Sequence, residues 1–283
     1  MLRTLLICLV ALAAGPVVAK DTDEGPHQAL DTKDLARGWL AVGRLEMGRE
    51  GTCTGALIAP RLVLTAAHCV YDDDTNEQRK ADTIVFKAGY RHGRSAAKRK
   101  GRRIVVHNDY QYASKNYLNR VATDVALIEL DQPIGEAGVV PFQRHRKPVV
   151  NEKVMVVSYA RGRQNAPALE DGCQMLDAYA GALIYDCDTD FGSSGAPIFV
   201  MTDAGPKIAS IISGGTTYKG KDVSLGAPLD KSVDRLLNKL ASSNPEAKLI
   251  SVGEASGSTA KRVSISDQLK AEKKGSRLPQ IKR

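Results

Sequence analysis

The chain has 283 residues, a length that fits one large domain or two small ones. Hydrophobic residues make up 43% and charged residues 25%, which is enough to bury a core and excludes a chain disordered throughout, a collagen and a coiled coil. The formal net charge of +8 suits an acidic partner or surface. Aromatic residues are only 5%, which argues against stacking of single-stranded nucleic acid along a basic groove.

Residues 1–19 have the pattern of a secretory signal peptide. Arg3 supplies a positive charge, residues 5–14 are an apolar run too short to span a bilayer, and small residues precede a cut near Ala19. We therefore expect an exported protein, secreted or periplasmic, with no stable insertion in the membrane. A short membrane anchor is the alternative.

Four cysteines remain once Cys8 is removed with that segment: Cys53, Cys69, Cys173 and Cys187. An even count in an exported chain favours two disulfides, for which three pairings are possible. We expect Cys53–Cys69 and Cys173–Cys187, because each closes a short local loop that contributes about 3 kcal/mol. The sequence has no CxxC pair with a nearby pair of histidines, so we expect no metal and no cofactor.

Between residues 38 and 229, short apolar runs alternate with Gly, Pro, Asn and Asp clusters, which is typical of an all-β barrel or sandwich. Examples of the predicted strands are 39–45, 55–58, 62–64, 83–88, 103–106, 125–129, 154–159, 197–200 and 209–212. Residues 231–240 follow the helical period and predict a helix that closes the β body. We expect a leader (20–37), a main domain (38–243) with β halves at about 38–145 and 150–229 and a helix at about 230–242, and a basic, disordered tail (244–283).

Three segments carry residues suited to nucleophilic attack on a carbonyl; they contain His68, Asp124 and Ser194. A serine hydroxyl is a weak nucleophile, so a base must take its proton, and an imidazole titrates near the required pH. A buried carboxylate orients that imidazole. The developing oxyanion needs backbone N–H donors, which Gly192 and Ser194 are positioned to provide because the glycine permits a tight turn.

The order His68, Asp124, Ser194 is that of the chymotrypsin-type triad. The surrounding residues resemble the trypsin-like serine proteases, in Thr65-Ala66-Ala67-His68-Cys69, in Asp124-Val-Ala-Leu-Ile-Glu-Leu130 and in Gly192-Ser-Ser-Gly-Ala-Pro197. Cys53-Thr-Gly-Ala-Leu-Ile58 looks like the strand that precedes the histidine motif, and Cys53–Cys69 like the disulfide of the histidine loop. The segment from Cys187 to Pro197 looks most like the bacterial branch, which includes glutamyl-endopeptidase-like enzymes.

This resemblance covers roughly residues 38–240. It implies two six-stranded antiparallel β-barrels with a C-terminal helix and an active site in the cleft between them. It also implies a monomeric endopeptidase acting on proteins or peptides, with His68 as general base, Asp124 as its orienting group and Ser194 as nucleophile.

The residues that would bind substrate are Asp188, Ser213, Gly214 and Gly215. Counted back from Ser194, Asp188 falls where trypsin has the carboxylate of its S1 pocket, and a buried carboxylate there favours Arg or Lys. The segment 213–215 resembles the strand that pairs with the substrate backbone. Cys187 has no match in trypsin's pocket, so Asp188 facing elsewhere is the alternative, and the lack of a histidine near Ser213 disfavours glutamyl specificity.

Two departures from the family pattern stand out. Ser193 occupies the position where most animal members have Asp, and no Ile-Val-Gly-Gly-like start precedes Trp39. We therefore hypothesise that activation does not use an inserted N-terminus paired with that Asp. The remaining histidines have no such context and are expected at the surface; they are His27, His92, His107 and His145.

Residues 91–103 contain seven basic side chains and no acid, and the tail is also basic. These stretches suit a polyanion, so a polyanion-binding protein on a protease scaffold, without turnover, is the rival function. A solvated loop is the other interpretation of 91–103. The complete triad argues against the rival function, because binding alone does not need it.

Overall fold

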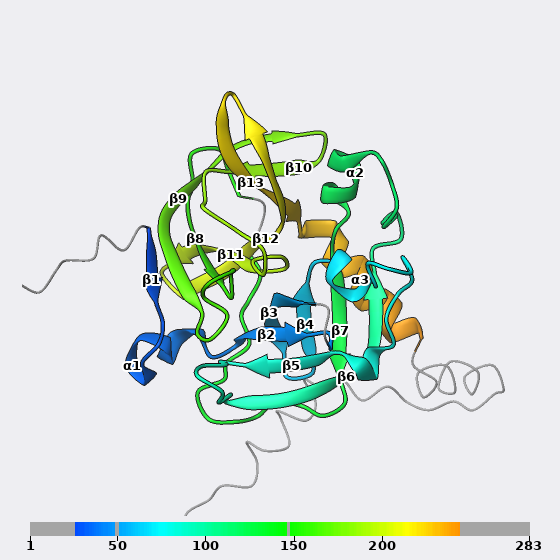
Figure 1. Cartoon of the computed structure of the whole chain (residues 1–283), viewed down its shortest axis with the longest axis vertical. Coiled ribbons are helices and arrows are strands. Elements are labelled where there is room, and N and C mark those ends of the chain that lie inside the picture. Colours follow the sequence, from blue (N-terminus) through cyan, green and yellow to red (C-terminus); the bar gives the residue numbers. More distant parts are fainter. Residues whose placement is uncertain (1–25, 49–50, 146–147, 244–283) are drawn as a thin grey trace, which may run out of the picture. The chain divides into compact units, whose positions relative to one another are not determined.

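The computed structural model describes residues 26–48, 51–145 and 148–243 (Figure 1). The expected signal peptide and the basic tail lie outside these residues. Two compact units are distinguished, residues 1–233 and residues 234–283. The first carries both β-barrels, and helix α3 (Asp230–Ser242) crosses the boundary.

The first barrel closes through six antiparallel strands in the order β2-β3-β4-β7-β6-β5. They are β2 (Val42–Glu46), β3 (Thr52–Ala59), β4 (Leu62–Thr65), β5 (Val85–Ala88), β6 (Ala97–Val106) and β7 (Ala126–Leu130). Leu45, Leu57, Leu64, Phe86 and Leu127 are fully buried in it. Short helical turns join these strands: η2 (His68–Val70), η3 (Ala81–Thr83) and α2 (Tyr117–Ala122).

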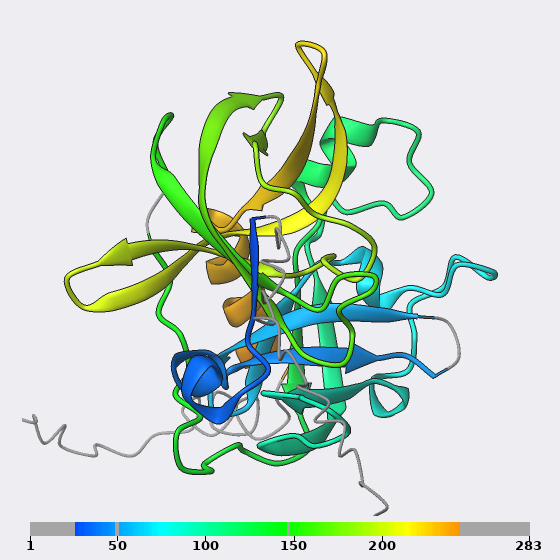
Figure 2. The ribbon, with the colours of Figure 1, turned by 60° about the vertical axis from the view of Figure 1, so that its left-hand side comes forward.

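The second barrel is formed by β8 (Lys153–Ser158), β9 (Ala168–Tyr179), β10 (Ala182–Tyr185), β11 (Pro197–Thr202), β12 (Gly205–Tyr218) and β13 (Lys221–Pro228). It closes because β8 pairs with both β9 and β11. Its core includes Val156, Met175, Tyr185 and Ile198. The β12–β13 hairpin extends beyond the rest of the barrel (Figure 2). The expected all-β fold of two six-stranded barrels with a C-terminal helix is confirmed.

A seventh strand, β1 (His27–Ala29), adds to the edge of β9 with His27 opposite Glu170. It is followed by α1 (Lys33–Ala36) and η1 (Arg37–Trp39). Part of the segment that the sequence predicts as a leader is thus hydrogen-bonded to the second barrel (Figure 2).

From Ala97 onward, the basic stretch 91–103 belongs to strand β6, which differs from the interpretation of the whole stretch as a solvated loop. In β6, Ala97 and Gly101 face inward while Lys98 and Lys100 are exposed, so the alternation of a half-buried strand is present but coded by small residues. Arg99 pairs with Glu136 at 2.6 Å. The small residues Ala97 and Gly101 at the inward positions are the signal that distinguishes this strand from a basic loop.

Thr54 of β3 connects the two barrels where the candidate site lies. Its hydroxyl donates to the carbonyl of Gly192 at 2.8 Å and accepts the N–H of Tyr159 at 3.0 Å. Its N–H donates to the carbonyl of Ser194 at 2.9 Å. The loop that carries Ser194 is thus bonded directly to a strand of the first barrel.

No helix in the described part of the chain is long and apolar enough to cross a membrane.

Candidate active site

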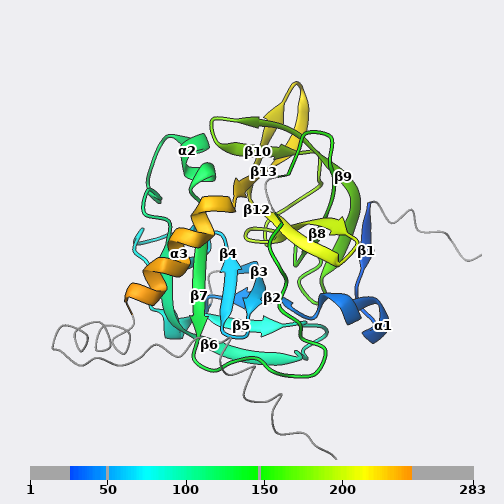
Figure 3. The same ribbon diagram turned by 180° about the vertical axis from the view of Figure 1, so that it is seen from behind.

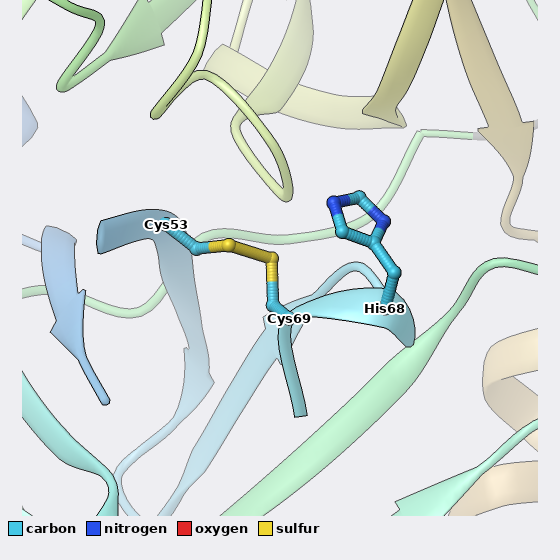
Figure 4. A group of neighbouring side chains, drawn as sticks. All are labelled: Cys53, His68 and Cys69. Carbon is cyan, nitrogen blue, oxygen red and sulfur yellow. A yellow bond between two sulfur atoms is a disulfide. The ribbon is translucent and has the colours of Figure 1, made fainter. Parts of the chain in front are cut away.

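His68 projects from η2, which the Cys53–Cys69 disulfide ties to β3 (Figure 4). Asp124 follows α2 and is buried, with 2% of its surface exposed. One oxygen of Asp124 accepts the His68 backbone N–H at 2.8 Å, and the other lies 2.6 Å from Nδ1 of the His68 ring. An ionised carboxylate only accepts hydrogen bonds, so Nδ1 carries the proton and Nε2 keeps a free lone pair.

The electrostatic environment favours a positive charge on His68. Burial alone would lower the pKa of the ring, but the charge of Asp124 and the hydrogen bond to it outweigh burial and raise the pKa above its ordinary value. Arg120 opposes the rise and Asp73 adds to it. Asp124 therefore stabilises the His68 ring when Nε2 takes up a proton.

The Ser213 side chain contacts the carboxylate of Asp124. Its hydroxyl donates to Asp124 Oδ2 at 2.5 Å, so Asp124 receives three hydrogen bonds in all. The sequence predicts Ser213 as a substrate-binding residue through its backbone, and its side-chain role is an addition from the structure.

The loop at Ser194 leaves two backbone donors unused. Ser193 N–H donates to the carbonyl of Asp190, whereas in the described part of the chain the N–H groups of Gly192 and Ser194 make no hydrogen bond. Gly192 has φ +93°. A β-carbon there would lie 2.4 Å from the Tyr159 carbonyl oxygen, so only glycine fits this turn.

Residues of both barrels line one hollow, which we call the inter-barrel hollow. Its walls include Cys53, His68, Tyr71, Arg79, Phe191, Gly192 and Ser194. His68 and Ser194 thus face the same space from different barrels, as the sequence predicts for a cleft between two halves.

Ser193 is buried and donates its hydroxyl to Ser158 at 3.1 Å. Where most animal members have a carboxylate that pairs with a cationic N-terminus, this chain has a neutral hydrogen bond within the second barrel. The loop is therefore held without an ion pair at that position.

A second hollow, which we call the acidic hollow, lies between residues 186–189, 215–217 and 222–224. It is lined by the carboxylates of Asp186, Asp188 and Asp222 and, within the described residues, by no basic side chain. Gly215 borders it, as the sequence predicts for a substrate-binding residue, whereas Gly214 lies one residue outside its lining.

Asp188 is more exposed than the buried carboxylate that the sequence predicts. Its side chain is 69% exposed, and its Oδ2 lies 3.0 Å from Nε2 of His27. Its N–H donates to the buried carboxylate of Glu170 at 2.8 Å. The side chain is free of the barrel core because Cys187 beside it turns inward to form the disulfide with Cys173.

Sequence reasoning missed this cluster beneath the acidic hollow. The His27 side chain is half-buried, with 12% of its surface exposed, and His107 is buried, whereas the sequence predicts both at the surface. Burial raises the pKa of Glu170 to about 7, with Asp188 and Asp186 adding to the rise. No local motif marks these groups, because β1 and β9 bring them together from 143 positions apart (170 − 27).

Relatives of this chain include the glutamyl endopeptidase of Bacillus licheniformis, which is 28% identical over 197 residues covering 66% of this chain and 59% of the relative. Phenoloxidase-activating factor 3 of Holotrichia diomphalia is 27% identical over 224 residues covering 66% and 60%. The chain thus spans about three fifths of these relatives.

A solved structure of Glu endopeptidase in complex with MPD has a TM-score of 0.61 at 17% identity and covers 76% of this chain and 95% of its own. At that identity the likeness concerns the fold, and the fold agrees with the two barrels seen here. The family model for trypsin matches residues 31–232, which include the segments of His68, Asp124 and Ser194, and the chain belongs to the trypsin family.

Proposed function

We propose that this protein is an exported serine endopeptidase that works through His68, Asp124 and Ser194. His68 Nε2 takes the proton of the Ser194 hydroxyl while Oγ bonds to the substrate carbonyl carbon. The carbonyl oxygen becomes an oxyanion that accepts hydrogen bonds from Gly192 and Ser194 N–H. When the C–N bond breaks, the leaving amine takes the proton from His68, and water then hydrolyses the acyl-enzyme by the same base.

The observation that carries this proposal is the hydrogen-bonded His68–Asp124 pair facing the same hollow as Ser194, beside two unused N–H donors. Each part has a separate structural explanation, but together they supply the base, its orienting group, the nucleophile and the oxyanion donors.

The test is labelling of the mature protein with a fluorophosphonate probe, beside Ser194→Ala and His68→Ala. Labelling should occur in the wild type and be lost in both variants. An unlabelled, folded wild type that stays unlabelled after limited trypsin treatment would refute the assignment and favour the polyanion-binding alternative.

Cleavage after Arg or Lys is the specificity that the acidic hollow supports. Its three carboxylates attract a cationic side chain and repel the glutamate that the name of the Bacillus licheniformis relative indicates for that protein. Exposure of Asp188 weakens the attraction through solvent screening, so we expect a preference and not an absolute requirement.

Profiling on a peptide library tests this specificity. Asp188→Asn should reduce the preference for Arg and Lys several-fold, whereas Asp203→Asn, an exposed residue between β11 and β12, should leave it unchanged. A wild-type preference for Glu would refute it.

Export agrees with the two disulfides, because such bonds persist in oxidising compartments. Mass analysis of the protein recovered from a periplasmic extract or culture medium should find Lys20 at its N-terminus. The polyanion alternative is weakened since Arg99 and Arg103 are paired with Glu136 and Glu129. Retention on a heparin column that does not change with salt would exclude an electrostatic mode altogether.

A further inference from the structure

The outer edge of β12 beyond Ser213 is open to a peptide. In the described strands, β11 pairs with β12 only from Gly205 to Ile211, whereas β13 pairs with the other edge of β12 out to Tyr218. An extended chain can add to such an edge through backbone hydrogen bonds. Gly214 and Gly215 lie on this edge, directly after Ser213, whose hydroxyl donates to Asp124, and Gly215 borders the acidic hollow.

Tyr117 already occupies this edge. Its hydroxyl donates to the carbonyl of Gly215 at 3.0 Å. A β-carbon on Gly214 would lie 2.5 Å from the same hydroxyl oxygen, so the phenol lies directly over the Gly214 backbone. Tyr117 therefore both occupies the hydrogen-bond acceptor of Gly215 and covers the backbone of Gly214.

The tyrosine is held there by α2, of which it is the first residue (Figure 3). The helix is capped by Asn116, whose side chain accepts the Asn119 N–H at 3.1 Å. Val121 is buried in a cluster with Ile184 and Leu225 of the second barrel. The same helix leads into Asp124, so the cover and the triad carboxylate share one support.

We propose that Tyr117 limits how much the enzyme favours long substrates over short ones. The backbone of a peptide upstream of the cleaved bond reaches the Gly215 carbonyl only by displacing the Tyr117 hydroxyl. This inference rests on the proposed peptidase function and adds a residue that the triad and the acidic hollow do not include. The wild-type enzyme gains little from the substrate hydrogen bond to the Gly215 carbonyl, since that bond replaces the one made by Tyr117.

Tyr117→Phe removes the hydroxyl and keeps the ring, and Tyr117→Ala removes both. The substrates are acetyl-X and acetyl-Ala-Ala-Ala-X p-nitroanilides, where X is the residue preferred in library profiling. The ratio of kcat/KM for the long over the short substrate should rise about five- to tenfold in Tyr117→Phe, with the short substrate unchanged. Tyr179→Phe, an exposed tyrosine at the end of β9, is the matched control and should keep the wild-type ratio.

A second measurement does not depend on turnover. Binding of acetyl-Ala-Ala-Ala-X amide, measured by calorimetry in the Ser194→Ala background, should tighten by a similar factor when Tyr117→Phe is added. A ratio and an affinity that stay constant or fall in both Tyr117 variants would overturn the proposal. Absence of fluorophosphonate labelling would refute the peptidase function alone, because the binding measurement still decides the role of Tyr117.

Discussion

Replacement of Gly192 by Ala tests whether the turn before Ser194 creates the oxyanion site. The alanine has to adopt φ +93°, at a cost of about 1–2 kcal/mol for an L-residue. Its β-carbon would also lie 2.4 Å from the Tyr159 carbonyl oxygen, which is about 1.0 Å inside an ordinary contact of 3.4 Å (3.4 − 2.4). The peptide must move by that amount, and such a displacement takes the Gly192 N–H away from the oxyanion.

Loss of one oxyanion donor lowers kcat by about 10²- to 10³-fold. Steady-state hydrolysis of a small ester measures this effect, with urea denaturation to report stability. Gly205→Ala is the matched control, because Gly205 has φ +92° but no atom within 4 Å of its β-carbon position. Both variants should lose similar stability from the backbone conformation, while only Gly192→Ala loses kcat. A folded Gly192→Ala protein with wild-type kcat would refute the assigned oxyanion site.

Asp124→Asn should lower kcat about 10⁴-fold. The amide N–H of the asparagine would donate to His68 Nδ1 and hold the ring in the tautomer that has its proton on Nε2. A proton NMR spectrum checks the tautomer, and single-turnover kinetics check the rate. The acid limb of wild-type kcat/KM should have its midpoint above 6.5, since the pKa of His68 is raised and only the neutral ring accepts the serine proton. Glu170→Gln removes a carboxyl whose pKa rises from 4.5 to about 7 on folding. A carboxyl whose pKa is raised by folding stabilises the folded state at low pH. The free energy of unfolding of the wild type should therefore fall by on the order of 2 kcal/mol relative to that of the variant as pH rises from about 4.5 to 7. The same pH dependence of the free energy of unfolding in both proteins, measured in urea, would contradict the assignment. Converting Cys173 and Cys187 to Ala opens a loop with a sequence separation of 14 and should lower the free energy of unfolding by about 3 kcal/mol in urea denaturation; an unchanged free energy would contradict the expected stabilisation.

The strands could be predicted where most of their residues are apolar and could not where they are polar. β4 and β7 are mostly apolar, and each end lies within one residue of the predicted range. β9 was missed because it is long, polar and interrupted by Gly172 in a positive-φ conformation, where its register with β8 also shifts nearby. Its strand character comes from pairing on both edges, which a local pattern does not encode.

The residues proposed as catalytic could be found from the sequence because each lies in a short motif whose neighbours serve the same local geometry. Cys69 beside His68 is one such neighbour, since its disulfide holds the turn that carries the histidine. Tyr117 and His27 have no motif, because their partners Gly215 and Asp188 lie 98 and 161 positions away along the chain. Their roles depend on how α2 and β1 dock on the second barrel, which only the folded chain specifies.

Thr54 explains how His68 and Ser194, which come from different barrels, line one hollow. Its side chain and N–H hold Gly192 and Ser194, while its carbonyl accepts the hydroxyl of Thr65, three residues before η2 begins at His68. Thr54 also follows Cys53, whose disulfide fixes that same turn. His68 and Ser194 are therefore positioned against consecutive residues of one buried strand, Cys53 and Thr54 of β3. These bonds resist small movements of the two barrels that would separate His68 from Ser194. A lone serine–histidine contact would have to resist such movement by itself, with one hydrogen bond worth about 1 kcal/mol.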